Sequence, residues 1–215
     1  MWLVGITPQE LNSLPKVKEC VKKVRESRLQ STFKQTRDLA DTPTLFREQL
    51  NPRTYLAVPK VSSENRRYVP IGYLDESVIP GDKLFIIPEA TLYDFGILTS
   101  NVHMAWMRAV AGRLKSDYSY SNTIVYNNFP WPTPIPAQKE RIEKTAQAIL
   151  DARALYPESS LADLYDELTM PVELRKAHRA NDKAVMEAYG FWGRLNSEAA
   201  CVAELMKLYK ALSEK

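Results

Sequence analysis

The feature that most constrains this chain is a change of periodicity at Gly112. In segment 101–110, apolar residues recur at helical spacing, and Ser100 or Asn101 offers a side-chain oxygen to cap the first turn. In segment 114–121 the spacing becomes two, which is typical of a strand with one polar side. The polar set is Lys115, Asp117, Ser119 and Ser121. A capped helix running directly into such a strand favours an α+β fold.

Two of these polar residues have complementary hydrogen-bonding chemistry. On an extended strand, Lys115 and Asp117 would stand about 7 Å apart on one face. An ammonium group donates to the major-groove acceptors of guanine, and a carboxylate accepts from the cytosine amino group, so the two residues suit one G·C pair. A solvent-facing ion pair on an edge strand explains the same pattern and is its more common meaning.

Three segments upstream predict an irregular small sheet, because they are rich in β-branched and aromatic residues and carry prolines at their edges. They are TYLAVPKV (54–61), RYVPIGYL (67–74) and KLFIIPEA (83–90). Residues 62–67, between the first two, combine hydroxyl and guanidinium groups that are good donors to phosphate. A solvated turn would have the same composition.

The two ends of the chain have different sequence patterns. Residues 1–6 resemble a short strand, and segment 17–29 resembles a charged helix. This helix either faces phosphate or is an amphipathic surface helix, and the glutamates that interrupt its basic residues favour the surface helix. Alternating prolines in segment 130–136 predict a stiff connector between domains. Beyond it, apolar stripes at helical spacing predict an all-α bundle. We therefore expect domains at 1–132 and 137–215.

Composition narrows the class of protein. With 215 residues and 45% hydrophobic content, the chain can bury a core, and no apolar run is long enough to span a membrane. The start lacks the features of a signal peptide, so we expect a cytoplasmic protein. Cys20 and Cys201 lie far apart without a histidine cluster, which disfavours a disulfide framework or a zinc site. Lys and Arg exceed Asp and Glu only before Pro136.

No catalytic motif is evident, so whether the chain is an enzyme by itself stays open. Residues 127–130, Asn-Asn-Phe-Pro, have the wrong order for the Asn-Pro-Pro-Tyr motif of adenine methyltransferases. No glycine-rich loop follows a predicted strand, and His103 and His178 have no nearby nucleophile or second histidine in the sequence. These absences argue against a self-contained methyltransferase or nuclease.

Much of the chain resembles the MmeI-like restriction-modification enzymes, which join an endonuclease, an adenine DNA methyltransferase and a specificity domain in one polypeptide. The similar region is the target-recognition domain with the C-terminal helices. The resemblance rests on segments 58–74 (VPKVSSENRRYVPIGYL), 88–121 (PEATLYDFGILTSNVHMAWMRAVAGRLKSDYSYS), 124–132 (IVYNNFPWP) and 150–185 (LDARALYPESSLADLYDELTMPVELRKAHRANDKAV).

The resemblance implies a DNA-specificity fragment of a bacterial defence enzyme, which binds double-stranded DNA and positions a catalytic part encoded upstream. Residues around one strand would read bases: Lys115, Asp117 and Ser119. Others would contact the DNA backbone: Lys60, Ser62, Ser63, Arg66, Arg67, Lys83 and Arg113. The resemblance also implies that S-adenosylmethionine, with Mg²⁺ as a further candidate, binds to the full-length enzyme and that this fragment binds no cofactor. A protein-interaction module with a helical docking bundle is the alternative function.

Overall fold

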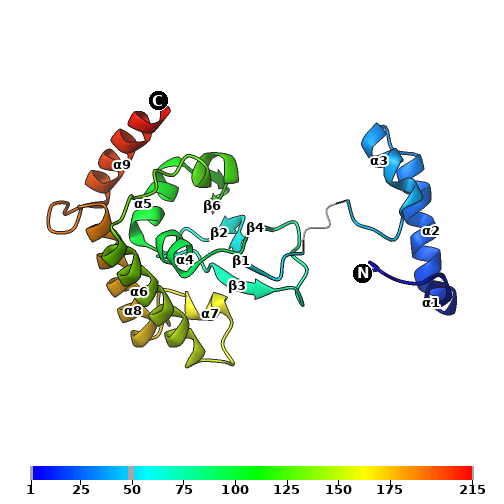
Figure 1. Ribbon diagram of the computed structural model, residues 1–215, viewed down its shortest axis with the longest axis horizontal. Helices are drawn as coiled ribbons and strands as arrows, with labels where there is room; N and C mark the ends of the chain where they lie inside the picture. Colours follow the sequence, from blue (N-terminus) through cyan, green and yellow to red (C-terminus); the bar gives the residue numbers. More distant parts are fainter. Residues whose placement is uncertain (1, 48–50, 215) are drawn as a thin grey trace. The chain divides into compact units, whose positions relative to one another are not determined.

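The structure, a computed structural model, describes residues 2–47 and 51–214. The chain divides into two compact units, Met1–Asn51 and Pro52–Lys215. Their elements can be followed by label and colour in Figure 1.

The first unit is helical. Its elements are α1 (Pro8–Ser13), α2 (Pro15–Leu29), α3 (Lys34–Asp38) and a 3-10 turn, η1 (Leu39–Asp41). Thr7 and Glu10 form a reciprocal capping box that starts α1, with N–H to side-chain oxygen distances of 2.8 and 3.2 Å. The charged helix expected at 17–29 is confirmed within α2, whereas the strand expected at the start is wrong, because residues 2–6 form a turn. Residue 1 lies outside the described residues.

The second unit contains a small antiparallel sheet in which β1 is central and β3 and β4 flank it. The strands are β1 (Thr54–Pro59), β3 (Gly72–Asp75) and β4 (Leu84–Pro88). Leu56, at 0% exposure, pairs with Tyr73 on one side and Ile87 on the other. Pro59 and Pro88 end their strands, where a missing N–H interrupts no ladder. The three predicted strands are therefore present at about the predicted positions.

A second sheet of three short antiparallel strands has β6 at its centre, between β2 and β5. They are β2 (Val61–Ser62), β5 (Gly112–Leu114) and β6 (Asp117–Ser119). Tyr118, in the middle of β6, is buried and pairs with both Ser62 and Arg113. Because β6 pairs with both β2 and β5, the polar loop that follows β2 lies next to the β5–β6 hairpin.

The remaining elements of the second unit are helical, and their buried side chains share one core with those of the strands. They are α4 (Leu92–Leu98), α5 (Asn101–Val110), a π-helical turn η2 (Asn122–Tyr126), α6 (Pro136–Ala154), α7 (Leu161–Leu164), α8 (Val172–Ala188) and α9 (Glu198–Ser213). Ser100 caps α5 as predicted, accepting a 3.3 Å hydrogen bond from the N–H of His103. The indole N–H of Trp106 donates to the carbonyl of Val125 (3.0 Å), which fixes η2 against α5.

The C-terminal helices share this core. Helix α6 packs against both α8 and α4, and α9 packs against α5. Gly96 permits the contact between α4 and α6, since a Cβ there would lie 2.7 Å from Cγ2 of Ile142 and 3.2 Å from Cβ of Ala146. The predicted α+β class and the C-terminal helical region are both confirmed.

Candidate nucleic-acid interface

The base-reading candidates lie on a hairpin. Leu114 pairs with Asp117, so Lys115 and Ser116 form the two-residue turn between β5 and β6. Lys115 has a φ of 56°, in the left-handed region that suits the first central residue of a primed hairpin turn. The predicted single strand over 114–121 is therefore wrong, and Lys115 and Asp117 do not alternate along one extended face. They lie at the tip of a two-stranded ribbon, with Lys115 in the turn and Asp117 at the start of β6.

Arg113 stabilises this tip from inside the hairpin. Its guanidinium donates to the carbonyl of Ser116 (2.7 Å) and lies 3.8 Å from the ring centroid of Tyr118. Lys115 has no hydrogen-bond or ion-pair partner among the described residues. The side chain of Lys115 is thus free to meet a ligand, whereas Arg113 is partly committed to holding the turn.

Asp117 and Ser119 lie two residues apart in β6 and share the face opposite the buried Tyr118. Oδ1 of Asp117 accepts from the N–H of Glu64 at 3.4 Å, and Glu64 also approaches Arg113 at 3.6 Å. These contacts place the loop formed by residues 63–67, called here the arginine loop, directly beside the hairpin tip. Residues predicted to read bases and to bind phosphate are brought together.

Five of the backbone candidates lie in two settings. Arg66, Arg67 and Ser63 belong to the arginine loop, where Arg67 is exposed and the N–H of Arg66 donates to the carbonyl of Ser63 (3.1 Å). Lys60 and Lys83 are adjacent through a 3.0 Å backbone hydrogen bond. The ammonium of Lys60 lies over the ring of Phe85 at 4.6 Å, and that of Lys83 pairs with Asp82 at 2.9 Å.

Ser62 is the exception among the backbone candidates. It lies in β2 with 3% of its surface exposed, which disfavours a direct contact with phosphate. Alternation along the strand explains this position, because Val61 faces out where Ser62 faces in. The phosphate contact of Ser62 stays a prediction.

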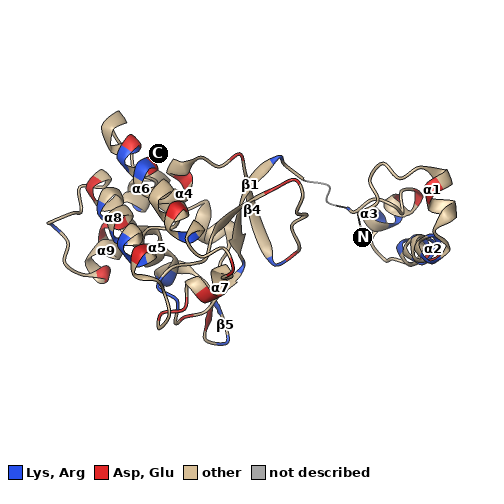
Figure 2. Cartoon of the chain, turned by 90° about the horizontal axis from the view of Figure 1, so that it is seen from below, with Lys and Arg blue, Asp and Glu red and all other residues tan. Residues whose placement is uncertain are grey.

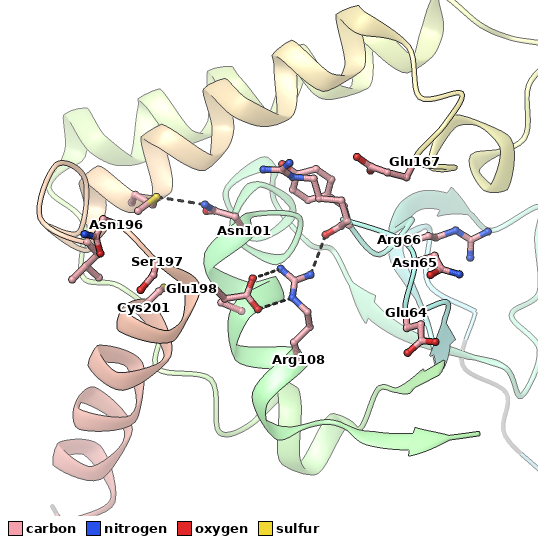
Figure 3. A pocket seen from close by; sticks show the side chains of 15 residues that line it. Glu64, Asn65, Arg66, Asn101, Arg108, Glu167, Asn196, Ser197, Glu198 and Cys201 are labelled. Carbon is pink, nitrogen blue, oxygen red and sulfur yellow. Dashed lines mark hydrogen bonds and ion pairs between the residues drawn. The ribbon is translucent and has the colours of Figure 1, made fainter. Parts of the chain in front are cut away.

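Sequence reasoning missed a polar cavity of about 570 Å³ beside the arginine loop (Figure 3). Its walls come from the loop, from Asn101 and Arg108 on α5, and from residues 195–198 before and within α9. Arg108 forms a bidentate pair with Glu198, at 2.8 and 2.9 Å. The available signal was Arg108, a charged residue late in a helix that is otherwise uncharged, because its partner Glu198 is 90 positions away.

The two histidines are buried and bonded to tyrosines. Nε2 of His103 lies 2.9 Å from the hydroxyl of Tyr120, and Nε2 of His178 lies 2.6 Å from that of Tyr165. Burial lowers the pKa of each imidazole to about 3, so both are neutral near pH 7. Their role in the fold is packing and hydrogen bonding within the core.

Neither a metal-binding cluster nor a membrane-spanning helix is present among the described residues. Within 2–47 and 51–214, no three or more His, Cys, Asp or Glu side chains gather where they could hold a metal ion. Among helices in the same ranges, none combines the length and apolarity needed to cross a membrane.

Comparisons with known proteins agree on one family. The family model for the MmeI target recognition domain matches residues 1–133, and that for the MmeI C-terminal domain matches residues 135–215. DNA methyltransferase A of Bacillus subtilis (strain 168) is 38% identical over 216 residues, covering 100% of this chain and 24% of that protein.

A solved structure, that of the Type IIL restriction-modification enzyme MmeI in complex with DNA, matches with a TM-score of 0.92 and 46% identity. The match covers 100% of this chain and 29% of the MmeI chain, so the chain spans only about a quarter of the length of these relatives. With both family models matched in order and more than half of the residues in the first, the chain belongs to the MmeI family, in its target recognition and C-terminal domains.

Proposed function

We propose that this chain is the DNA-specificity part of a restriction-modification methyltransferase and that its β5–β6 hairpin reads base edges in the major groove. The observation that carries the proposal is the hairpin tip, where the side chain of Lys115 has no partner within residues 2–47 and 51–214 and Asp117 lies beside the arginine loop. The major groove is about 12 Å wide and admits a two-stranded ribbon. A tip that enters such a groove brings both side chains to the base edges.

The roles of the tip residues follow from their chemistry. Lys115 would donate to N7 and O6 of guanine, and Asp117 would accept from the cytosine amino group, so that together they select a G·C pair. Ser119 lies further along the same face of β6 as Asp117 and would meet a neighbouring base. A surface ion pair between Lys115 and Asp117 is disfavoured, since Asp117 bonds to the N–H of Glu64 instead.

The surrounding cations would bind the phosphates that flank the groove. Arg66 and Arg67 stand on the arginine loop next to the hairpin, and Lys60 and Lys83 form a second basic pair. Such contacts fix the position of a protein on the duplex without reading its sequence. Ser63 and Arg113 complete the proposed backbone set.

The relatives are longer than this chain, and methyl transfer would belong to the parts that it lacks. S-adenosylmethionine in such enzymes needs a pocket, typically at a glycine-rich turn between a strand and a helix. Here the described connection between β4 and α4 is Glu89-Ala90-Thr91, which contains no glycine. The residues present do not fit the cofactor. Its binding, and any Mg²⁺, would fall to a methyltransferase and a nuclease outside this chain.

Selection from a randomised duplex library tests the function directly. We expect the 215-residue chain to enrich duplexes with one fixed G·C position, and a variant with Lys115→Ala and Asp117→Ala to retain binding but lose that preference. Binding of the wild-type chain without any sequence preference would contradict base reading. Calorimetry with S-adenosylmethionine is the companion test, in which clear binding by this chain alone would show that the cofactor site lies within it.

A further inference from the structure

We propose that Glu198, the first residue of α9, is a positioning residue that sets the arginine loop for DNA through Arg108. The inference rests on the proposed function, in which Arg66 and Arg67 contact phosphate. It assigns a role in binding to the C-terminal helices, which lie far from the hairpin in sequence.

One guanidinium links three segments of the chain (Figure 3). Nε and Nη2 of Arg108, on α5, contact the two carboxylate oxygens of Glu198 at 2.8 and 2.9 Å. Nη1 of the same group donates to the backbone carbonyl of Arg67 at 3.3 Å. A guanidinium is planar and presents its donors at fixed angles, so holding its Nε and Nη2 edge on a carboxylate also orients the third nitrogen, Nη1.

The arginine loop is held at both ends and borders the cavity in between. At its C-terminal end, the carbonyl of Arg67 is fixed by Arg108, and the hydroxyl of Tyr68 donates to Asp182 at 2.6 Å. At the other end, the N–H of Glu64 bonds to Asp117. The cavity of about 570 Å³ lies beside this loop, and Arg108 is among the residues that line it. Its guanidinium therefore connects the loop to α9 across a space that other side chains leave open.

Pre-ordering of the loop would favour binding of DNA. Immobilising a rotamer-rich side chain on association costs free energy, and a loop already fixed in its bound form avoids part of that cost. Without Glu198, Arg108 keeps its bond to Arg67 but loses the two contacts that orient it. The arginine loop would then sample other conformations before binding.

Electrostatic attraction alone predicts that removing Glu198 changes the affinity for DNA in the opposite direction. The direction of the measured change therefore tests the inference. Glu198 is a carboxylate on the wall of a cavity that Arg66 and Arg67 also line. Its removal would strengthen binding to a polyanion if charge alone mattered. If Glu198 positions the loop, its removal weakens binding.

Glu204 provides a matched control on the same helix. Its carboxylate pairs with Arg194 at 3.2 Å and Lys207 at 2.7 Å, so Glu204→Ala also breaks an ion pair of α9, but one without a contact to the arginine loop. Fluorescence anisotropy with a labelled duplex would compare the full chain and both variants. We expect Glu198→Ala to weaken binding roughly three- to tenfold, the cost of ordering one or two side chains, and Glu204→Ala to leave it unchanged or slightly tighter.

Two further measurements separate positioning from a general structural effect. If Glu198 acts through Arg108, the double variant Arg108→Ala with Glu198→Ala binds no more weakly than Arg108→Ala alone. Amide hydrogen exchange at residues 64–68 should be faster in Glu198→Ala and unchanged in Glu204→Ala, with or without DNA.

Binding as tight as wild type, with unchanged exchange in the loop, would overturn the inference. A wild-type chain that binds no duplex would instead refute the proposed function, and the exchange measurement would still decide whether Glu198 positions the loop.

Discussion

The hydroxyl of Tyr68 donates a 2.6 Å hydrogen bond to Oδ2 of Asp182, a residue 114 positions later in the chain. The same carboxylate accepts from the N–H of Asn101 at 2.7 Å through its other oxygen. Tyr68 also stacks on His178 with ring centroids 4.1 Å apart. The residue that follows the arginine loop, Tyr68, is therefore hydrogen-bonded to α8 through Asp182, an ionisable residue that is only 6% exposed.

Asp182 gives stability a pH dependence of its own. Burial, the largest influence, raises its pKa from 3.8 to about 6. The folded chain therefore holds this proton more tightly than the unfolded chain, and the resulting stabilisation is complete below pH 4 and lost as the pH rises through 6. A shift of this size corresponds to roughly 3 kcal/mol at most.

Urea unfolding of wild type and Asp182→Asn between pH 4 and 8 measures that contribution as a difference. We expect the variant to gain stability relative to wild type as pH rises across this window. The histidines act with the opposite sign, because their pKa in the folded chain is about 3, below the unfolded value of 6.5, so protonation of the unfolded chain lowers stability as the pH falls below 6.5. They cancel in the difference, and a constant difference would show that Asp182 does not titrate as described.

Exchange of charge at the hairpin tip should change the preferred base pair. Lys115→Glu together with Asp117→Arg reverses donor and acceptor along the ribbon, so selection from a randomised library should move from G·C to C·G at one position. Each single substitution should bind worse than the pair, because one lost base contact costs about 1–3 kcal/mol. An unchanged preference in a fully folded double variant would exclude base reading by these residues.

Salt should weaken binding steeply. If four to six phosphates are contacted, affinity should fall roughly a hundredfold or more between 50 and 200 mM salt. Arg66→Ala should lower all duplex affinities alike and reduce the logarithmic salt slope by about one. Titration at several salt concentrations gives both quantities, and a slope near zero would remove the electrostatic basis of the interface.

The charges of the C-terminal helices should matter little for sequence preference. Basic and acidic residues are interspersed along α6 and α8 (Figure 2), and Arg141 pairs with Glu187 at 2.6 Å. Lys139→Ala and Arg141→Ala should therefore have small effects that are equal across sequences, in contrast to Lys115. The same library selection checks this, and a new preferred sequence in either variant would contradict the assignment.

Gly96→Ala should destabilise the second unit. The added Cβ would meet Ile142 at 2.7 Å, and overpacking of this kind costs about 1–3 kcal/mol. Combining it with Ile142→Ala should cost less than the sum of the two changes, because the clashing methyl is removed. Gly81→Ala is the matched control, since no atom lies within 4 Å of a Cβ built there. Thermal unfolding of the four variants provides the comparison.

Local chemistry was predictable from the sequence. The start of α5 follows from a side-chain oxygen at the capping position, where Ser100 accepts the expected backbone hydrogen bond. The strand positions follow from β-branched residues between prolines. In both cases the determining atoms lie within a few residues of one another.

The hairpin and the cavity were not predictable for two different reasons. The turn at Lys115 and Ser116 lacks the glycine or asparagine that usually marks a positive φ, so an unbroken strand was the simpler interpretation. The pairs of Arg108 with Glu198 and of Tyr68 with Asp182 join segments 90 and 114 positions apart. No local pattern records such distant partners.

The close approach at Gly96 also bears on the order in which the chain can fold during synthesis. Helix α4 emerges from the ribosome before Ile142, Ala146 and Asn181, the residues that complete the surface around Gly96. Until α6 and α8 have been made, the apolar side of α4 stays uncovered. A nascent chain that stalls near residue 133 would expose this surface to chaperones and proteases, so synthesis of α6 and α8 is the step that completes folding of the recognition part.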